Sequence, residues 1–164
     1  MWLGIVAIVI VLIAVACYLN AITIAFTSCS QFEDYSRNPN EKKTRMLFKK
    51  GCDCKRIVIG DGRFRKVRVV ELDGLSELES VVIGTWSFTY AKEDDDIRNS
   101  ERNDGSYRIV NCPKLKSIQI GRESFRDYHT FELNNLPSLQ SIDIGMYCFE
   151  YAPFSLIGMI GGMV

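Results

Sequence analysis

The sequence lacks an excess of charge of either sign, and histidine is almost absent. Twenty Lys and Arg balance twenty Asp and Glu, so the chain has no field that would hold DNA or RNA, and we expect no nucleic-acid partner. The single histidine, His129, argues against a zinc site or a Ser-His-Asp triad and is expected at the surface. Six cysteines in 164 residues are too few for a disulfide scaffold.

Motifs of catalysis are lacking as well. The sequence contains no phosphate-binding loop, no nucleophile elbow and no metal-binding motif. We therefore expect no enzyme, no catalytic or metal site, no cofactor and no small-molecule substrate.

Charge is also absent from the beginning of the chain, because no charged residue precedes Glu33. The stretch from Trp2 to Thr27 is uncharged, and about 20 helical residues cross a bilayer. We expect a transmembrane helix in residues 1–29, with the lipid bilayer as a partner through Trp2 to Thr27. A cleaved signal peptide and a lipoprotein signal ending at Cys17 are the alternatives, but both need a basic segment at the start.

The residues after this stretch are polar and basic. Six Lys and Arg lie between positions 37 and 50, and none precedes the apolar stretch. Basic flanks stay on the cytoplasmic side of a membrane, so we expect a single-pass protein with its bulk in the cytoplasm. Residues 30–50 are predicted to be a linker, with a short helix possible over residues 41–50 and Asn40 as its N-cap.

A repeat occupies the rest of the chain. Four segments share a strand-like pattern followed by Gly-x-x-x-Phe: residues 57–64, 81–88, 118–125 and 142–149. Their glycines are separated by 24, 37 and 24 residues. The longer gap holds an insertion, an acidic loop near residues 91–105. Its acidic run, residues 93–96, lacks the spacing of a calcium loop and is expected to face solvent.

Each unit predicts two short strands. The Ile-x-Ile pattern alternates as a half-buried strand does, and a second apolar run follows the phenylalanine. One such unit buries only one face, so the units must stack. We predict a mainly β fold, a solenoid of about four 24-residue units within residues 51–164. The glycine should mark a turn with positive φ or close packing, and the phenylalanine should point inward.

The segment 136–144, Leu-Pro-Ser-Leu-Gln-Ser-Ile-Asp-Ile, resembles the leucine-rich-repeat consensus, as does segment 111–118. The ending Ile-Gly-x-x-Ser/Cys-Phe resembles the BspA-like subclass. This resemblance implies a solenoid that binds a protein through exposed strand positions, which here are Val58, Val82, Gln119 and Asp143. The consensus asparagine is replaced by Gly62, Trp86, Glu123 and Tyr147, so its buried asparagine ladder is not expected.

The predicted function is a membrane-anchored protein–protein interaction module with an unidentified partner. Two alternatives stay open: a truncated, non-functional fragment of a longer repeat array, and a small accessory subunit of a membrane complex.

The remaining predictions concern the cysteines and the C-terminal tail. The pair Cys52 and Cys54 would need ligands from a second chain to bind zinc, and Cys29 is either palmitoylated or an unmodified thiol. Cys112 and Cys148 are expected to be small core residues. The tail, residues 152–164, starts a fifth unit, with its projected inward positions at residues 155, 157, 160 and 163.

Overall fold

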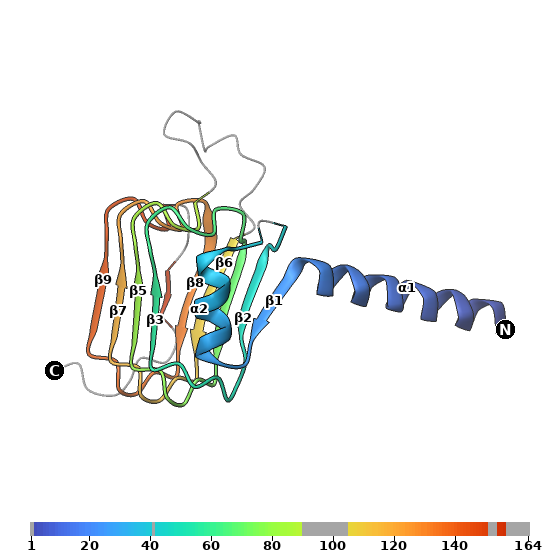
Figure 1. Cartoon of the computed structure of the whole chain (residues 1–164), viewed down its shortest axis with the longest axis horizontal. Coiled ribbons are helices and arrows are strands. Elements are labelled where there is room, and N and C mark those ends of the chain that lie inside the picture. The colour runs from blue at the N-terminus through green and yellow to red at the C-terminus, as the bar shows by residue number, and fades with distance from the viewer. Residues whose placement is uncertain (1, 41, 90–104, 151–153, 157–164) are drawn as a thin grey trace.

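Two parallel sheets face each other across an apolar interior in the computed structural model, which describes residues 2–40, 42–89, 105–150 and 154–156 (Figure 1). The six-stranded sheet contains β1 (Thr23–Phe26), β2 (Arg45–Phe48), β4 (Val69–Asp73), β6 (Gly105–Val110), β8 (Tyr128–Asn134) and β10 (Phe154–Leu156). The four-stranded sheet contains β3 (Arg56–Ile59), β5 (Ser80–Ile83), β7 (Ser117–Ile120) and β9 (Ser141–Ile144). The chain alternates between the sheets and forms a β-solenoid of about four turns. The predicted mainly β solenoid is confirmed.

The strands form where the sequence alternates. In β3 and β7, every second side chain is buried and the others face outward. Neighbouring strands of each sheet are parallel and in register, so equivalent residues of successive units stack on one another. The inward isoleucines and valines thereby form continuous apolar rows, which an isolated unit could not bury.

The glycines that follow β5, β7 and β9 permit close packing between units. A Cβ atom on Gly121 would lie 2.6 Å from the carbonyl carbon of Gly84 and 2.6 Å from the nitrogen of Thr85. Gly145 meets the backbone of Arg122 in the same way. The second of the two predicted reasons for these glycines, close packing, is therefore confirmed for Gly121 and Gly145.

The phenylalanines four residues later form an aromatic stack inside the solenoid, as predicted. Phe88 and Phe125 have ring centroids 4.6 Å apart, and those of Phe125 and Phe149 are 5.0 Å apart. All three have positive φ, between 51° and 57°. This backbone conformation is unfavourable for a bulky residue. It directs each ring into the interior, however, where the free energy gained by burying the ring offsets the backbone strain.

A ladder of side-chain hydrogen bonds joins successive units at the same turn. The hydroxyls of Ser87 and Ser124 donate to the carbonyls of Gly60 and Gly84, each at 2.7 Å. In the last unit the thiol of Cys148 donates to Gly121 at 3.1 Å. Cys148 is half-buried and packs against the core, as predicted, and it also takes the place of a ladder serine, which was not predicted. Cys112 is fully buried, as expected.

The opposite turn carries an asparagine ladder that the sequence analysis did not expect. Asn135 donates to Asn111, and Asn111 donates to Asp73, each at 2.8 Å. Both asparagines are exposed and have positive φ, which asparagine tolerates better than most residues. The ladder thus lies at the surface of a turn and not in the interior.

The prediction of a transmembrane helix is wrong. The apolar stretch is divided between α1 (Trp2–Ile22) and β1, which pairs with β2 and buries Phe26 in the core. Across the described ranges, no helix combines the length and the apolar composition that crossing a membrane requires. The expected cytoplasmic orientation rested on that anchor and loses its basis. Figure 1 shows α1 extending away from the solenoid.

The polar segment after this stretch belongs to the solenoid and is not a tether. Residues Cys29–Arg37 form α2, and Phe32 on α2 packs edge-on against Phe26 with ring centroids 5.4 Å apart. The possible helix over residues 41–50 is absent from the described part of that range, which holds β2 instead. Met46 and Phe48 on β2 are buried because they alternate toward the core.

The C-terminal tail continues the six-stranded sheet with a register different from the predicted one. Phe154 pairs with Phe131, and Leu156 pairs with Leu133. The last spacing is therefore one residue shorter than the 24-residue period, and the register predicted for Ser155 is wrong, because Ser155 pairs with Glu132 and not with Phe131. The projected positions 157, 160 and 163 lie outside the described residues. The predicted acidic loop, residues 91–105, falls almost entirely outside the described residues.

Candidate functional site

The outer face of the four-stranded sheet brings together all four residues that the sequence analysis selected. Val58 pairs in register with Val82, Val82 with Gln119, and Gln119 with Asp143. Adjacent strands lie about 4.8 Å apart, so the row extends over about 14 Å. Its members are exposed or half-exposed, and Val58 keeps 49% of its surface accessible. Their opposite neighbours in the strands form the core.

A second row lies beside the first on the same face. Arg56, Ser80, Ser117 and Ser141 occupy equivalent positions on β3, β5, β7 and β9. We call these eight residues the outer face of the four-stranded sheet. Its side chains are small and neutral in the middle, with a positive charge on Arg56 at one end and a negative charge on Asp143 at the other.

The polar side chains of this face have no partners within the described part of the chain. Arg56, Gln119 and Asp143 make no side-chain hydrogen bond or ion pair to any other described residue. The serines of the second row are likewise without a side-chain hydrogen bond among the described residues. These groups are free to bind an external donor or acceptor.

The central strands of the six-stranded sheet differ, because the outward charges of β4, β6 and β8 bind one another. Arg108 on β6 donates to Glu71 on β4 at 3.1 Å and to Glu132 on β8 at 2.7 Å. The hydrogen bond to Glu132 is the largest reason why the pKa of Arg108 is raised, against a smaller opposing effect of burial. This charge ladder stabilises the sheet and leaves little charge for a partner.

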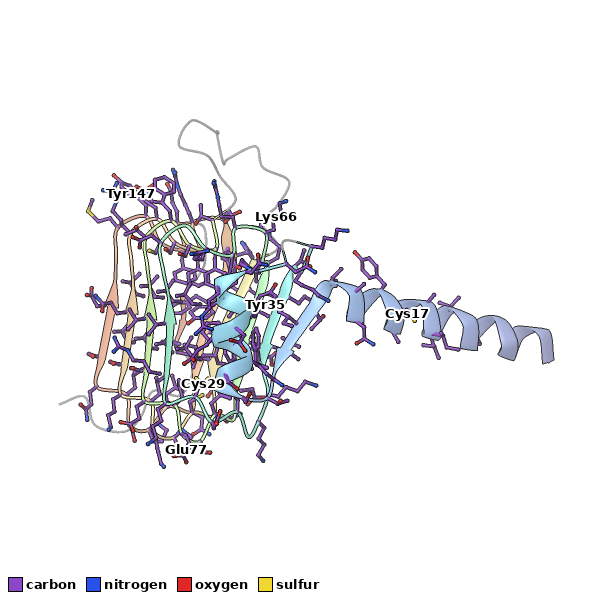
Figure 2. All side chains as sticks on the ribbon, viewed as in Figure 1. Cys17, Cys29, Tyr35, Lys66, Glu77 and Tyr147 are labelled. Atoms are coloured by element: carbon purple, nitrogen blue, oxygen red, sulfur yellow. The ribbon has the colours of Figure 1, made fainter. Side chains whose placement is uncertain are left out.

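The turns that lead from the six-stranded sheet into the four-stranded sheet also pair their charges with one another. Lys114 lies 2.9 Å from Glu77, and Lys116 lies 2.7 Å from Glu79. Figure 2 shows Glu77 at this edge and Tyr147 at the opposite edge. The hydrogen bond from Lys116 lowers the pKa of Glu79, whose side chain is half-exposed.

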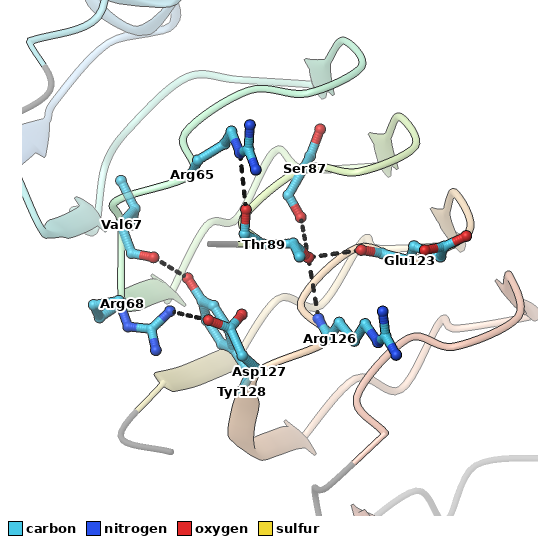
Figure 3. A network of polar contacts seen from close by, with 9 residues as sticks. All are labelled: Arg65, Val67, Arg68, Ser87, Thr89, Glu123, Arg126, Asp127 and Tyr128. Atoms are coloured by element: carbon cyan, nitrogen blue, oxygen red, sulfur yellow. Dashed lines mark hydrogen bonds and ion pairs between the residues drawn. The ribbon is translucent and has the colours of Figure 1, made fainter. Parts of the chain in front are cut away.

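A buried polar network ties distant units together near the start of β6 and β8 (Figure 3). Arg68 forms an ion pair with Asp127 at 2.6 Å, and the Tyr128 hydroxyl donates to the carbonyl of Val67 at 2.7 Å. The ring of Tyr128 packs directly over Gly105. Only glycine fits there, because a Cβ atom on Gly105 would lie 2.6 Å from the tyrosine ring. His129, at the adjacent register shift, is exposed as predicted.

Three cysteines gather under α2, which sequence reasoning missed. The Cys52 and Cys54 sulfurs are 3.6 Å apart, and Cys29 contributes a third thiol close enough to raise the pKa of Cys54. All three are free thiols. No group of three or more His, Cys, Asp or Glu side chains among the residues with described positions has an arrangement that could hold a metal ion. Proximity of Cys29 depends on the fold of α2 and leaves no local sequence signal.

Comparison of the chain with protein-family models, with curated proteins and with solved structures gave no match.

Proposed function

We propose that this chain is a protein-binding β-solenoid, of the BspA-like leucine-rich-repeat type, that holds its partner on the outer face of the four-stranded sheet. The observation that carries this proposal is the contrast between the two sheets. The outward charges of the central strands β4, β6 and β8 of the six-stranded sheet, which are Glu71, Arg108 and Glu132, are paired with one another. The polar groups on the four-stranded sheet have no partner among the described residues.

The chemistry of this face favours a polypeptide partner. Small side chains such as Val82 and Ser117 leave the middle of the face flat, so an extended segment can approach the strands closely. An acidic group on the partner would complement Arg56, and a hydrogen-bond donor would complement Asp143. Unpaired polar groups at a flat, partly apolar centre provide orientation, while burial of the valines provides free energy.

The test uses a photoreactive amino acid placed at position 119 of the full chain. A covalently captured protein is identified, produced separately and titrated against the wild-type chain. Replacing Val82 by Lys should weaken binding at least tenfold, because it places a charge at the centre of the face. The matched control, Val69→Lys, changes an outward position of β4 on the other sheet and should leave the affinity within twofold.

Both substitutions keep the inward side chains unchanged, so both variants should melt within a few degrees of the wild type. Equal loss of affinity in both variants would contradict the assignment to this face, as would unchanged affinity in Val82→Lys.

A further inference from the structure

Three thiols meet where α2 packs on the first turn of the solenoid. The sulfurs of Cys52 and Cys54 lie 3.6 Å apart, and both residues are almost completely buried. Cys29 is the first residue of α2, and its sulfur lies 4.0 Å from the carbonyl oxygen of Arg56, just beyond Cys54 in the chain. The Cys52 thiol forms a hydrogen bond with Cys54, and the Cys29 thiol lies close enough to raise the pKa of Cys54.

Backbone and side-chain contacts fix this arrangement. The N–H of Cys29 donates to the carboxylate of Asp53 at 2.7 Å, and Asp53 separates the two buried cysteines. The hydroxyl of Ser28 caps α2 by accepting from the N–H of Gln31 at 3.4 Å. Phe32, one turn later, is buried in the core. The start of α2 is therefore held against the segment that carries Cys52 and Cys54.

The thiols differ in accessibility. Cys29 is half-buried and is the most accessible of the three to a small molecule in solvent. Cys52 and Cys54 are buried. Burial raises the pKa of the Cys54 thiol, and its hydrogen bonds with Cys29 and Cys52 raise the pKa further. Because the thiolate is the nucleophile in thiol–disulfide exchange, a first attack from Cys54 is disfavoured.

We propose that Cys29 and Cys54 are a redox modification site, at which a low-molecular-weight disulfide of the glutathione type converts them into a disulfide that fastens α2 to the solenoid. The Cys29 thiolate attacks one sulfur of the small disulfide, whose S–S bond breaks and releases one thiolate, which is protonated. The Cys54 thiol then loses its proton to solvent and attacks the Cys29 sulfur, expelling the second small thiol. One small disulfide is reduced to two thiols, and two cysteines are oxidised to one disulfide.

The disulfide forms between Cys29 and Cys54, and not between Cys52 and Cys54, which are closer together in the sequence. A Cys52–Cys54 bond would close a ring around Asp53 alone, and the carboxylate of Asp53 is already engaged by the N–H of Cys29. A Cys29–Cys54 bond closes a loop that contains α2 and β2. A cross-link of this kind restricts the unfolded chain and so stabilises the folded state.

The experiment uses the full chain carrying Cys17→Ser, because Cys17 is exposed and would react between molecules. The protein is treated with glutathione disulfide at pH 8.5 and analysed by intact mass and by peptide mapping without reduction. We expect a mass loss of two hydrogens, a Cys29–Cys54 cross-link, and a rise in Tm of about 5–10 °C that dithiothreitol reverses.

Three variants sharpen the result. Cys29→Ser should abolish the loss of two hydrogens, whereas Cys52→Ala should retain it. The matched control is Cys148→Ser, which removes a half-buried thiol at the other end of the solenoid and should leave the cross-link unchanged. A stable glutathione adduct on Cys29 without conversion, a Cys52–Cys54 cross-link, or no change of the folded protein would each overturn the proposal. Mapping of the Cys17→Ser protein alone decides among these outcomes.

Discussion

The two ends of the solenoid bury the same kind of residue to different extents. At the N-terminal end, α2 packs on the core, and Ile57 and Ile59 of β3 are 1% and 4% exposed. At the C-terminal end, β9 has a hydrogen-bonded neighbour on one side only within the described residues, and Ile142 and Ile144 are half-buried. Figure 1 shows α2 near β3, while β9 forms the opposite edge of its sheet.

The comparison shows that a repeat pattern specifies which side chains point inward, whereas the neighbouring layer decides whether they are buried. The Ile-x-Ile pattern of β9 matches that of β7, whose isoleucines are 1–2% exposed. Met146 and Tyr147, in the turn after β9, are 67% and 55% exposed. Helix α2 supplies at one end what a further strand supplies between units, as a capping element does in other repeat proteins.

The largest expected effect comes from damage to the covered end. Replacing Phe32 by Ala removes the α2 side chain that packs against Phe26 and Phe48, with ring centroids 5.4 and 5.1 Å away. The free energy of unfolding should fall by about 3–5 kcal/mol, as for other buried aromatic residues. Urea denaturation measures this change. A loss below about 1 kcal/mol would show that α2 contributes little to the core.

The second prediction compares equivalent positions in two strands. Ile118→Ala in β7 should lower the free energy of unfolding by about 2–4 kcal/mol, because Ile118 is fully buried. Ile142→Ala occupies the same register position in β9 and should cost about 1 kcal/mol, since its side chain keeps part of its contact with water. Equal losses in thermal or urea unfolding would contradict the difference between the covered and open layers.

Close packing of the strand-ending glycines gives the third prediction. Gly121→Ala should destabilise the protein by about 2–3 kcal/mol, because the new Cβ would overlap the backbone of Gly84 and Thr85. Gly60→Ala is the matched control, since a Cβ there has no neighbour within 4 Å, and its effect should stay below about 0.5 kcal/mol. Similar effects at both positions would exclude close approach as the role of Gly121.

The smallest stability effect is expected for the turn ladder at the open end. Cys148→Ser restores the residue that donates this hydrogen bond in the two preceding units, and should stabilise the protein by about 0.5–1 kcal/mol. Burial also raises the pKa of the Cys148 thiol, so wild-type Cys148 should react slowly with thiol reagents at neutral pH and faster as the pH rises. If Cys148→Ser lowers the free energy of unfolding instead, the sulfur contributes through packing and the hydrogen-bond account is wrong.

The sequence predicted the repeated part well because its signals are local and periodic. The alternation of Val81 and Ile83, and the phenylalanine that follows, recur in each unit at spacings of 24 or 37 residues and match the observed strands and stack. The same alternation placed Val58, Val82, Gln119 and Asp143 outward, where the structure aligns them in one row.

The N-terminal part was predicted poorly because composition obscured its strands. Thr23–Phe26 continues an uncharged stretch, so no residue in the sequence marks a boundary before β1. Met46 and Phe48 lie one 24-residue period before Val70 and Leu72, a signal that was available but hidden by the basic residues around them. The meeting of Cys29 with Cys54 depends on tertiary packing of α2 and has no local signal.

Hydrogen exchange of the full chain, followed by mass spectrometry, tests the contrast between the two ends most directly. Peptides that cover β3, beneath α2, and the central strands β5 and β7 should exchange slowly and with similar protection. Peptides that cover β9 should exchange at least tenfold faster, because this strand lies at the edge of its sheet and its isoleucines are half-buried. Protection of β9 equal to that of β3 would contradict the account.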